Sequence, residues 1–103
     1  MLKLNLLKWL EDWYYSNCDG DWEHLYGVTI STLDNPGWTI KIELLETFME
    51  TKQFQAIKHF RTEEDWIDCK VTNGVFTGCG GPRNLEEIIR IFYKWVESNE
   101  EKN

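Results

Sequence analysis

The chain has 103 residues, of which 42% are hydrophobic and 15% aromatic. This length fits one domain over residues 1–103, and the apolar content is too high for a disordered chain. The formal net charge is −7, which argues against direct binding to nucleic acid, because that affinity comes largely from lysine and arginine. An acidic surface favours a basic protein partner instead.

The sequence contains no signal for secretion or membrane insertion. The N-terminal apolar run meets Glu11 and Asp12 and has no small-residue cleavage site, so we expect no signal peptide. No run approaches the roughly 18 apolar residues that a membrane span needs. The cysteines Cys18, Cys69 and Cys79 have long spacings without a CxxC pair, which fits free thiols in a reducing cytosol. We therefore expect a cytoplasmic protein without membrane contact.

Residues 4–16 predict the first helix. Their apolar side chains follow helical spacing and form one face, which comprises Leu6, Leu7, Leu10, Trp13 and Tyr14. The following "NCDGD" is expected to end this helix, because Gly20 can adopt positive φ and the neighbouring Asn and Asp favour turns.

A β-hairpin is predicted next. Residues 26–33 and 38–44 each alternate apolar and polar side chains, as antiparallel strands do when one face covers a core. Between them, Pro36 and Gly37 fit the two central positions of a type II turn.

A second hairpin is predicted near residues 65–72 and 75–79, joined by Asn73-Gly74, the strongest short hairpin signal. Residues 45–52 fit either a helical turn or a loop. Residues 53–61 predict a further strand, although their apolar residues do not alternate cleanly.

The last predicted element is a helix over residues 85–98. Asn84 is expected to cap it, and Glu87 completes a pair typical of a capping box. The order of elements predicts an α+β domain: an antiparallel meander sheet of about five strands, with an N-terminal and a C-terminal helix packed on one face.

The stretch "CDGDWEH", residues 18–24, concentrates side chains that could carry chemistry. Its glycine position and the lack of a closing Glu do not fit a calcium loop, and a zinc site on Cys18 and His24 would need two distant ligands. A small enzyme or metal-binding domain that uses Glu23, His24 and a cysteine is the alternative reading. No Cys/His signature spacing supports it, so we expect no metal, cofactor or catalytic residue.

The glycine-rich "GCGGPRN" precedes the last helix and could be taken for a phosphate loop. It lacks the Walker lysine and the GxGxxG spacing, and Arg83 is its sole cation. A structural loop that leads into the helix cap is the favoured interpretation.

Several motifs together resemble a known family. The stretch "WLEDWYYSNCDGDWEHLYGVTISTLDNPGWTIKIEL", with "CDGDWEH" about ten residues before "TLDNPGW", is similar to the immunity protein 53 family of bacterial polymorphic toxin systems. The later "EDW" at 64–66 and the "NLEEI" helix start add to the resemblance. It implies a small cytoplasmic α+β protein that is encoded beside a toxin and neutralises it by stoichiometric binding, without catalysis. The toxin's activity does not follow from the resemblance.

A contact surface for a basic toxin, such as a nuclease, is predicted in the loops, where binding residues concentrate. Tryptophans beside the loop acids are its predicted anchors, since indoles are enriched at binding hot spots. We also expect Trp22 and His24 to brace their end of the fold. The sequence leaves open whether the chain is a monomer or a weak dimer. The predicted partner-binding residues are Asp19, Asp21, Trp22, Glu23, Asp34, Trp38, Glu63, Glu64, Asp65 and Trp66.

Overall fold

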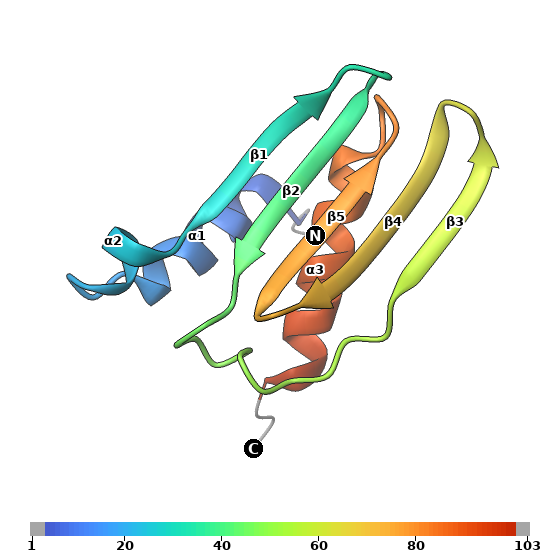
Figure 1. Cartoon of the computed structure of the whole chain (residues 1–103). Coiled ribbons are helices and arrows are strands. Elements are labelled where there is room, and N and C mark those ends of the chain that lie inside the picture. Colours follow the sequence, from blue (N-terminus) through green and yellow to red (C-terminus); the bar gives the residue numbers. More distant parts are fainter. Residues whose placement is uncertain (1–3, 101–103) are drawn as a thin grey trace.

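The computed structural model describes residues 4–100, and its framework is a five-stranded antiparallel sheet with both long helices on one side (Figure 1). This confirms the predicted α+β class with a helix near each end of the chain. The elements in chain order are α1 (Leu6–Asn17), α2 (Trp22–Leu25), β1 (Val28–Leu33), β2 (Gly37–Glu43), β3 (Ile57–Thr62), β4 (Asp65–Thr72), β5 (Val75–Gly80) and α3 (Leu85–Asn99).

The strand order β1-β2-β5-β4-β3 differs from a simple meander, because β5 lies between β2 and β4. The long connection over residues 44–56 is responsible. It carries the chain along one end of the sheet, past the β4–β5 hairpin, to the far edge where β3 lies (Figure 1). The inner side of β2 is thereby left to pair with β5, and β1 and β3 become the two edges of the sheet.

The two predicted hairpins are present, but one turn differs. Asn73 and Gly74 both have positive φ, at 53° and 76°, as the Asn-Gly signal predicted. The Asn35–Pro36 peptide bond is cis and Gly37 lacks positive φ, so the predicted type II turn is wrong. Gly37 belongs to β2 instead, where a Cβ would collide with the carbonyl oxygen of Gly80.

The connection between β2 and β3 contains successive turns and no helix. The predicted strand over 53–61 begins later, at Ile57. The reason is that the preceding residues contact the core: the carbonyl of Gln53 accepts a hydrogen bond from the Trp95 indole at 2.8 Å, and Phe54 packs on Phe76 and Trp95.

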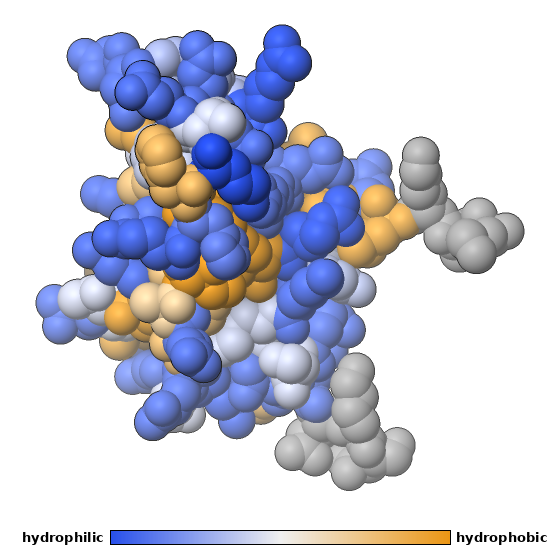
Figure 2. Space-filling view, turned by 90° about the vertical axis from the view of Figure 1, so that its right-hand side faces the viewer, coloured by the Kyte–Doolittle hydropathy of each residue, from blue (hydrophilic) through white to orange (hydrophobic). Residues whose placement is uncertain are grey.

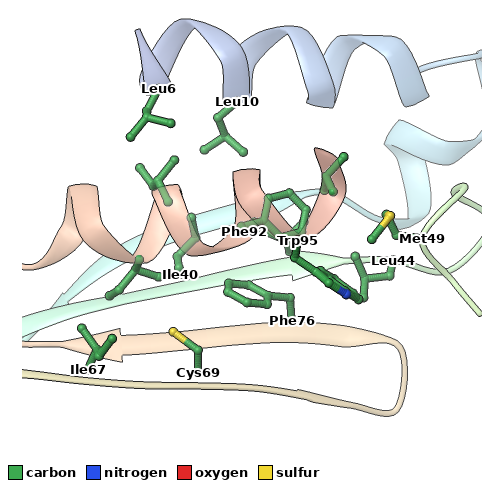
Figure 3. Packing of buried hydrophobic residues seen from close by; sticks show 14 residues of the cluster. Leu6, Leu10, Ile40, Leu44, Met49, Ile67, Cys69, Phe76, Phe92 and Trp95 are labelled. Atoms are coloured by element: carbon green, nitrogen blue, oxygen red, sulfur yellow. The ribbon is translucent and has the colours of Figure 1, made fainter. Parts of the chain in front are cut away.

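The core lies between α3 and the sheet (Figure 3). Phe92 and Trp95 point from α3 towards Phe76 of β5, and all three are buried. Helix α1 packs chiefly against α3 rather than against the strands, and it adds Leu6 and Leu10 to the core. No helix within residues 4–100 is long and apolar enough to cross a membrane.

Candidate functional site

The turn between α1 and α2 is held together by its own carboxylates. Asp19 Oδ1 accepts hydrogen bonds from the backbone N–H groups of Asp21 and Trp22, each at 2.9 Å. The Glu23 carboxylate accepts from the N–H groups of Asp19 and Gly20, at 3.0 and 2.9 Å. Asp19 and Glu23 therefore stabilise the turn, whereas no side-chain partner of Asp21 is found within the described part of the chain.

These hydrogen bonds favour the ionised carboxylates. The pKa of Asp19 is lowered, chiefly by the N–H group of Trp22 and then by that of Asp21. The pKa of Glu23 is also lowered, first by its own N–H group and then by those of Asp19 and Gly20.

We expect Asp19→Ala to lower the melting temperature at pH 7 by an amount that fades in acid. A carboxyl group whose pKa is lower in the folded chain stabilises it above the unfolded pKa of about 3.9, and this stabilisation disappears as the pH falls through the folded value. Thermal unfolding of both proteins between pH 7 and pH 2, followed by circular dichroism, measures the difference. Asp19→Asn is the control, since its amide oxygen can still accept both hydrogen bonds. A deficit that is independent of pH would contradict the prediction.

Trp22 lies in the interior, and its assignment as a contact anchor is therefore corrected. Its side chain is 1% exposed, and the indole N–H donates to the Leu45 carbonyl at 2.9 Å. The rings of Trp13, Tyr14 and Tyr26 surround it. As placed, Trp22 braces this end of the fold, as expected, and offers no surface to a partner.

His24 was predicted to brace this end of the fold, and this prediction is wrong. It follows Trp22 in the short helix α2 but is exposed, and it lines a groove between α1 and β1 that is described below. The short helix was not predicted, because its four residues are too few for a periodic pattern to be recognised.

A polar network occupies the opposite end of the sheet. The Arg61 guanidinium contacts Asp65 Oδ1 at 2.9 Å and Glu87 Oε1 at 2.7 Å. The Asn84 amide nitrogen donates to the same two oxygens, at 3.0 and 3.1 Å. The Arg61 hydrogen bond first, and then that of Asn84, lower the pKa of Asp65. Asp65 therefore ties the β3–β4 turn to the start of α3.

Asn84 precedes α3 as predicted, but its hydrogen bonds are not those of a capping box. Its side chain makes no cap hydrogen bond to the helix. Its Oδ1 accepts instead from the backbone N–H groups of Trp66 and Gly81, each at 3.2 Å. Because Gly81 N–H is used in this way and also bonds to the Trp66 carbonyl, the glycine-rich segment is a structural loop.

The two remaining predicted anchors are half-buried near this end. The Trp38 indole donates to the Pro82 carbonyl at 3.0 Å, which fastens β2 to the loop before α3. Trp66 lies opposite Phe60 in the β3–β4 register, and Phe60 is 72% exposed. Trp66 and Phe60 are thus cross-strand neighbours on the sheet face away from the helices.

The structure divides the predicted contact residues between opposite ends of the sheet (Figure 1). The turn with Asp19, Asp21 and Glu23 lies beside α2, near the start of β1. Asp34 and the other acids follow the far ends of β1 and β3. The predicted residues therefore form two acidic regions rather than one. The second comprises Glu63, Glu64 and Asp65 at the β3–β4 turn, whereas Asp34 lies apart from them in the β1–β2 turn at the opposite edge of the sheet.

Sequence reasoning missed a groove between α1 and β1. We call it the α1–β1 groove; its volume is about 580 Å³, and Glu11 and Glu43 are its acidic lining residues. Part of its apolar lining is well exposed, with Leu7 at 58% and Leu25 at 68%. Its main apolar lining residues are Leu7, Leu10, Tyr14, Leu25, Val28 and Ile30.

A sequence signal for this groove existed in the width of the α1 stripe. The predicted apolar face combined buried and exposed positions: Leu6 and Leu10 are 3% and 4% exposed, whereas Leu7 and Tyr14 are 58% and 38% exposed. Packing against α3 alone requires only a narrow apolar stripe. The broader stripe of α1 therefore indicates a second apolar contact.

The cysteines and acids do not gather into a reactive site. Burial raises the pKa of Cys69 to about 12, which disfavours its thiolate. The Cys18 thiol donates to the Tyr14 carbonyl, and Glu23 is engaged by backbone N–H groups. Across residues 4–100, no three His, Cys, Asp or Glu side chains lie close enough to hold a metal ion. No observation therefore favours the alternative of a small enzyme or metal-binding domain.

Comparison with known families gives the decisive match. Residues 7–97 match the family model described as Immunity protein 53, so the match covers both acidic regions and the α1–β1 groove. The chain belongs to the immunity protein 53 family. No curated protein and no solved structure matches it. For a member of this family, exposed acids and apolar grooves are candidate contacts for another protein.

Proposed function

We propose that this immunity protein 53 chain neutralises a cognate toxin in the cytoplasm by stoichiometric binding and without catalysis. The family match over residues 7–97 is the observation that carries the proposal. A chain of this size can supply its share of a standard interface, which buries roughly 1,200–2,000 Å² in total. The exposed apolar residues provide material for such an interface.

The proposed toxin is basic, and a nuclease fits this description because its active site binds phosphate. The net charge of −7 supports this choice. Within the described residues, four acids of the predicted contact set have no side-chain hydrogen bond or ion pair and remain available to a partner. These acids are Asp21, Asp34, Glu63 and Glu64.

Co-expression with the toxin encoded by the adjacent gene tests the proposal. We expect the chain to restore growth of cells that make the toxin, and to co-purify with it at a fixed stoichiometry. Continued growth arrest, with no complex on size-exclusion chromatography of two folded proteins, would contradict it. Degradation or modification of the toxin by substoichiometric amounts of the chain would instead indicate catalysis.

Charge reversal of the available acids is expected to slow association with the toxin. We expect at least one of two double variants, Asp21→Lys with Asp34→Lys or Glu63→Lys with Glu64→Lys, to lower the association rate constant roughly tenfold at low ionic strength. Because salt screens exposed charges, the difference should vanish near 0.5 M salt. Stopped-flow or surface-based kinetics measure the rates, and each double variant is the control for the other. Unchanged rates for both would exclude electrostatic steering by these turns.

A further inference from the structure

The two edges of the sheet differ in how well they are protected. Strand β3 carries Lys58, His59 and Arg61, and its pairing with β4 shifts register between Phe60 and Thr62. Charges and irregularities of this kind discourage pairing with a foreign strand. On the side of the molecule that carries β3, Figure 2 shows a hydrophobic area near the centre among many hydrophilic side chains, with smaller hydrophobic areas towards the margins.

Strand β1 lacks this protection. Its sequence "VTISTL" contains no charged residue and no proline, and it pairs with β2 in unbroken register from Val28 to Leu33. A regular, uncharged edge of six residues is a template for a further strand.

The free backbone groups of this edge follow from its hydrogen-bonding pattern. Glu43 N–H donates to the Gly27 carbonyl at 3.1 Å, so Gly27 and Glu43 form a hydrogen-bonded pair. In an antiparallel ladder such pairs alternate with pairs whose N–H and C=O groups point away. Val28, Ile30 and Thr32 therefore direct their backbone groups outward, where no other strand of the described chain lies.

The α1–β1 groove lies next to this edge. Val28 and Ile30 pair with Ile42 and Ile40, which are buried on the helix side of the sheet, so their side chains also point to that side. Both line the groove together with Leu7 and Leu25. A strand added to β1 would place every second side chain over the groove, because successive side chains alternate between the faces of a sheet.

The charges around the groove favour a basic occupant. Glu11 and His24 line it, and no lysine or arginine does. Glu43 also borders it, but its side chain alternates with that of Ile42 and points to the other face of the sheet, beside Lys41. Lys8 lies 3.6 Å from Glu11, but this pair is solvent-exposed and its contribution is small. Asp34 directly follows β1, and Asp21 is the N-cap residue of α2, the short helix that precedes β1. A second copy of the chain would bring another charge of −7 to the same place.

We propose that an extended segment of the cognate toxin pairs with the free edge of β1 and fills the α1–β1 groove. Alternate apolar side chains of that segment contact Leu7, Leu25 and Ile30, and its lysine or arginine residues lie beside Glu11. The proposal rests on the proposed function, because it names the surface that binds the toxin. It is a form of β-strand addition, in which main-chain hydrogen bonds give affinity and alternate side chains give specificity.

The first test compares two matched pairs of exposed apolar residues. Leu7→Ser with Leu25→Ser alters residues that are 58% and 68% exposed at the groove, and Phe48→Ser with Phe60→Ser alters residues that are 52% and 72% exposed elsewhere. We expect the groove variant to raise the Kd for the inactivated toxin at least tenfold. The control should change it less than threefold. Similar Kd values for both variants would overturn the proposal, provided that thermal unfolding shows both to be folded.

The second test measures hydrogen exchange of the backbone amides in the wild-type chain and needs no variant. In the saturated complex with the toxin, the amide protons of Val28, Ile30 and Thr32 should exchange with solvent at least tenfold more slowly than in the free chain. Exchange at Lys58 and His59 in β3 should be unchanged. Protection of β3 without protection of β1 would overturn the proposal.

The two hypotheses fail in different ways. If the wild-type chain neither binds the toxin nor restores growth, both the proposed function and the assignment of β1 as the toxin-binding edge are contradicted. If it binds tightly and the β1 amides exchange as before, only the β1 assignment fails. A dimer of the free chain that dissociates on Ile30→Pro would assign the edge to a second copy and also overturn the proposal.

Discussion

Replacing Phe92 with alanine is expected to lower the free energy of unfolding by about 3–5 kcal/mol. Phe92 is fully buried. Its ring packs edge-on against Trp9, Trp13 and Trp95 and at a tilt against Phe76, with centroid distances of 5.1–6.0 Å. It therefore connects α1, α3 and β5, and its loss would leave a cavity among rigid rings that cannot collapse to fill it.

Urea unfolding followed by tryptophan fluorescence measures this loss. Phe60→Ala is the matched control, because it deletes the same atoms from a side chain that is 72% exposed. The control should change the free energy of unfolding by less than about 0.5 kcal/mol. Because Trp9 and Trp13 belong to α1, Phe92→Ala should also loosen one wall of the α1–β1 groove and weaken toxin binding. Equal stability of the two variants would contradict the packing described here.

The local elements were predictable because their signals are contained in short stretches. Asn73-Gly74 specified its turn through two positive φ angles, and the 3.6-residue stripe of residues 85–98 specified the helix that covers the sheet. The strand order was not predictable in the same way. It depends on where the connection over residues 44–56 delivers β3, and that path is set by tertiary contacts such as the bond from Trp95 to Gln53.

The candidate site was less predictable than the fold. A carboxylate in a loop can accept hydrogen bonds from the protein's own backbone or contact a partner, and the surrounding sequence does not distinguish the two roles. Asp19 and Asp21 are two residues apart, yet the Asp19 carboxylate accepts hydrogen bonds from backbone N–H groups, whereas the Asp21 carboxylate remains available to a partner. Trp22 looked like Trp38 and Trp66 in sequence, but it is nearly fully buried. The edge position of β1 could not be deduced before the strand order was known, so the groove beside it had no complete signal in the sequence.

Asn84→Ala is expected to lower the free energy of unfolding by about 2–3 kcal/mol. Asn84 is 7% exposed, and its side chain makes four hydrogen bonds that join β4, the glycine-rich loop and α3. Removing it leaves the backbone N–H of Trp66 without its acceptor, and an unsatisfied buried donor costs about 1–3 kcal/mol. The lost bonds to Asp65 and Glu87 add a smaller amount, because these side chains are partly solvated. Urea unfolding at pH 7 measures the total.

Asn84→Asp separates the two halves of this network by their charge. The new carboxyl group keeps an acceptor for Trp66 and Gly81, but it replaces the amide donor with an oxygen that faces the carboxylates of Asp65 and Glu87. Repulsion between these groups should raise the pKa of the new carboxyl group above its unfolded value. Its destabilising effect is therefore largest above that raised pKa and shrinks as the pH falls towards about 4.

The pH dependence distinguishes this variant from Asn84→Ala, which introduces no titrating group. Relative to wild type, the stability deficit of Asn84→Asp should narrow strongly between pH 7 and pH 4. That of Asn84→Ala should narrow less, because this variant only removes the share of the lowered Asp65 pKa that comes from Asn84. A constant deficit for both would mean that the amide donor of Asn84 does not contact Asp65 and Glu87 in solution. The connection between the second acidic region and the start of α3 would then rest on Arg61 alone.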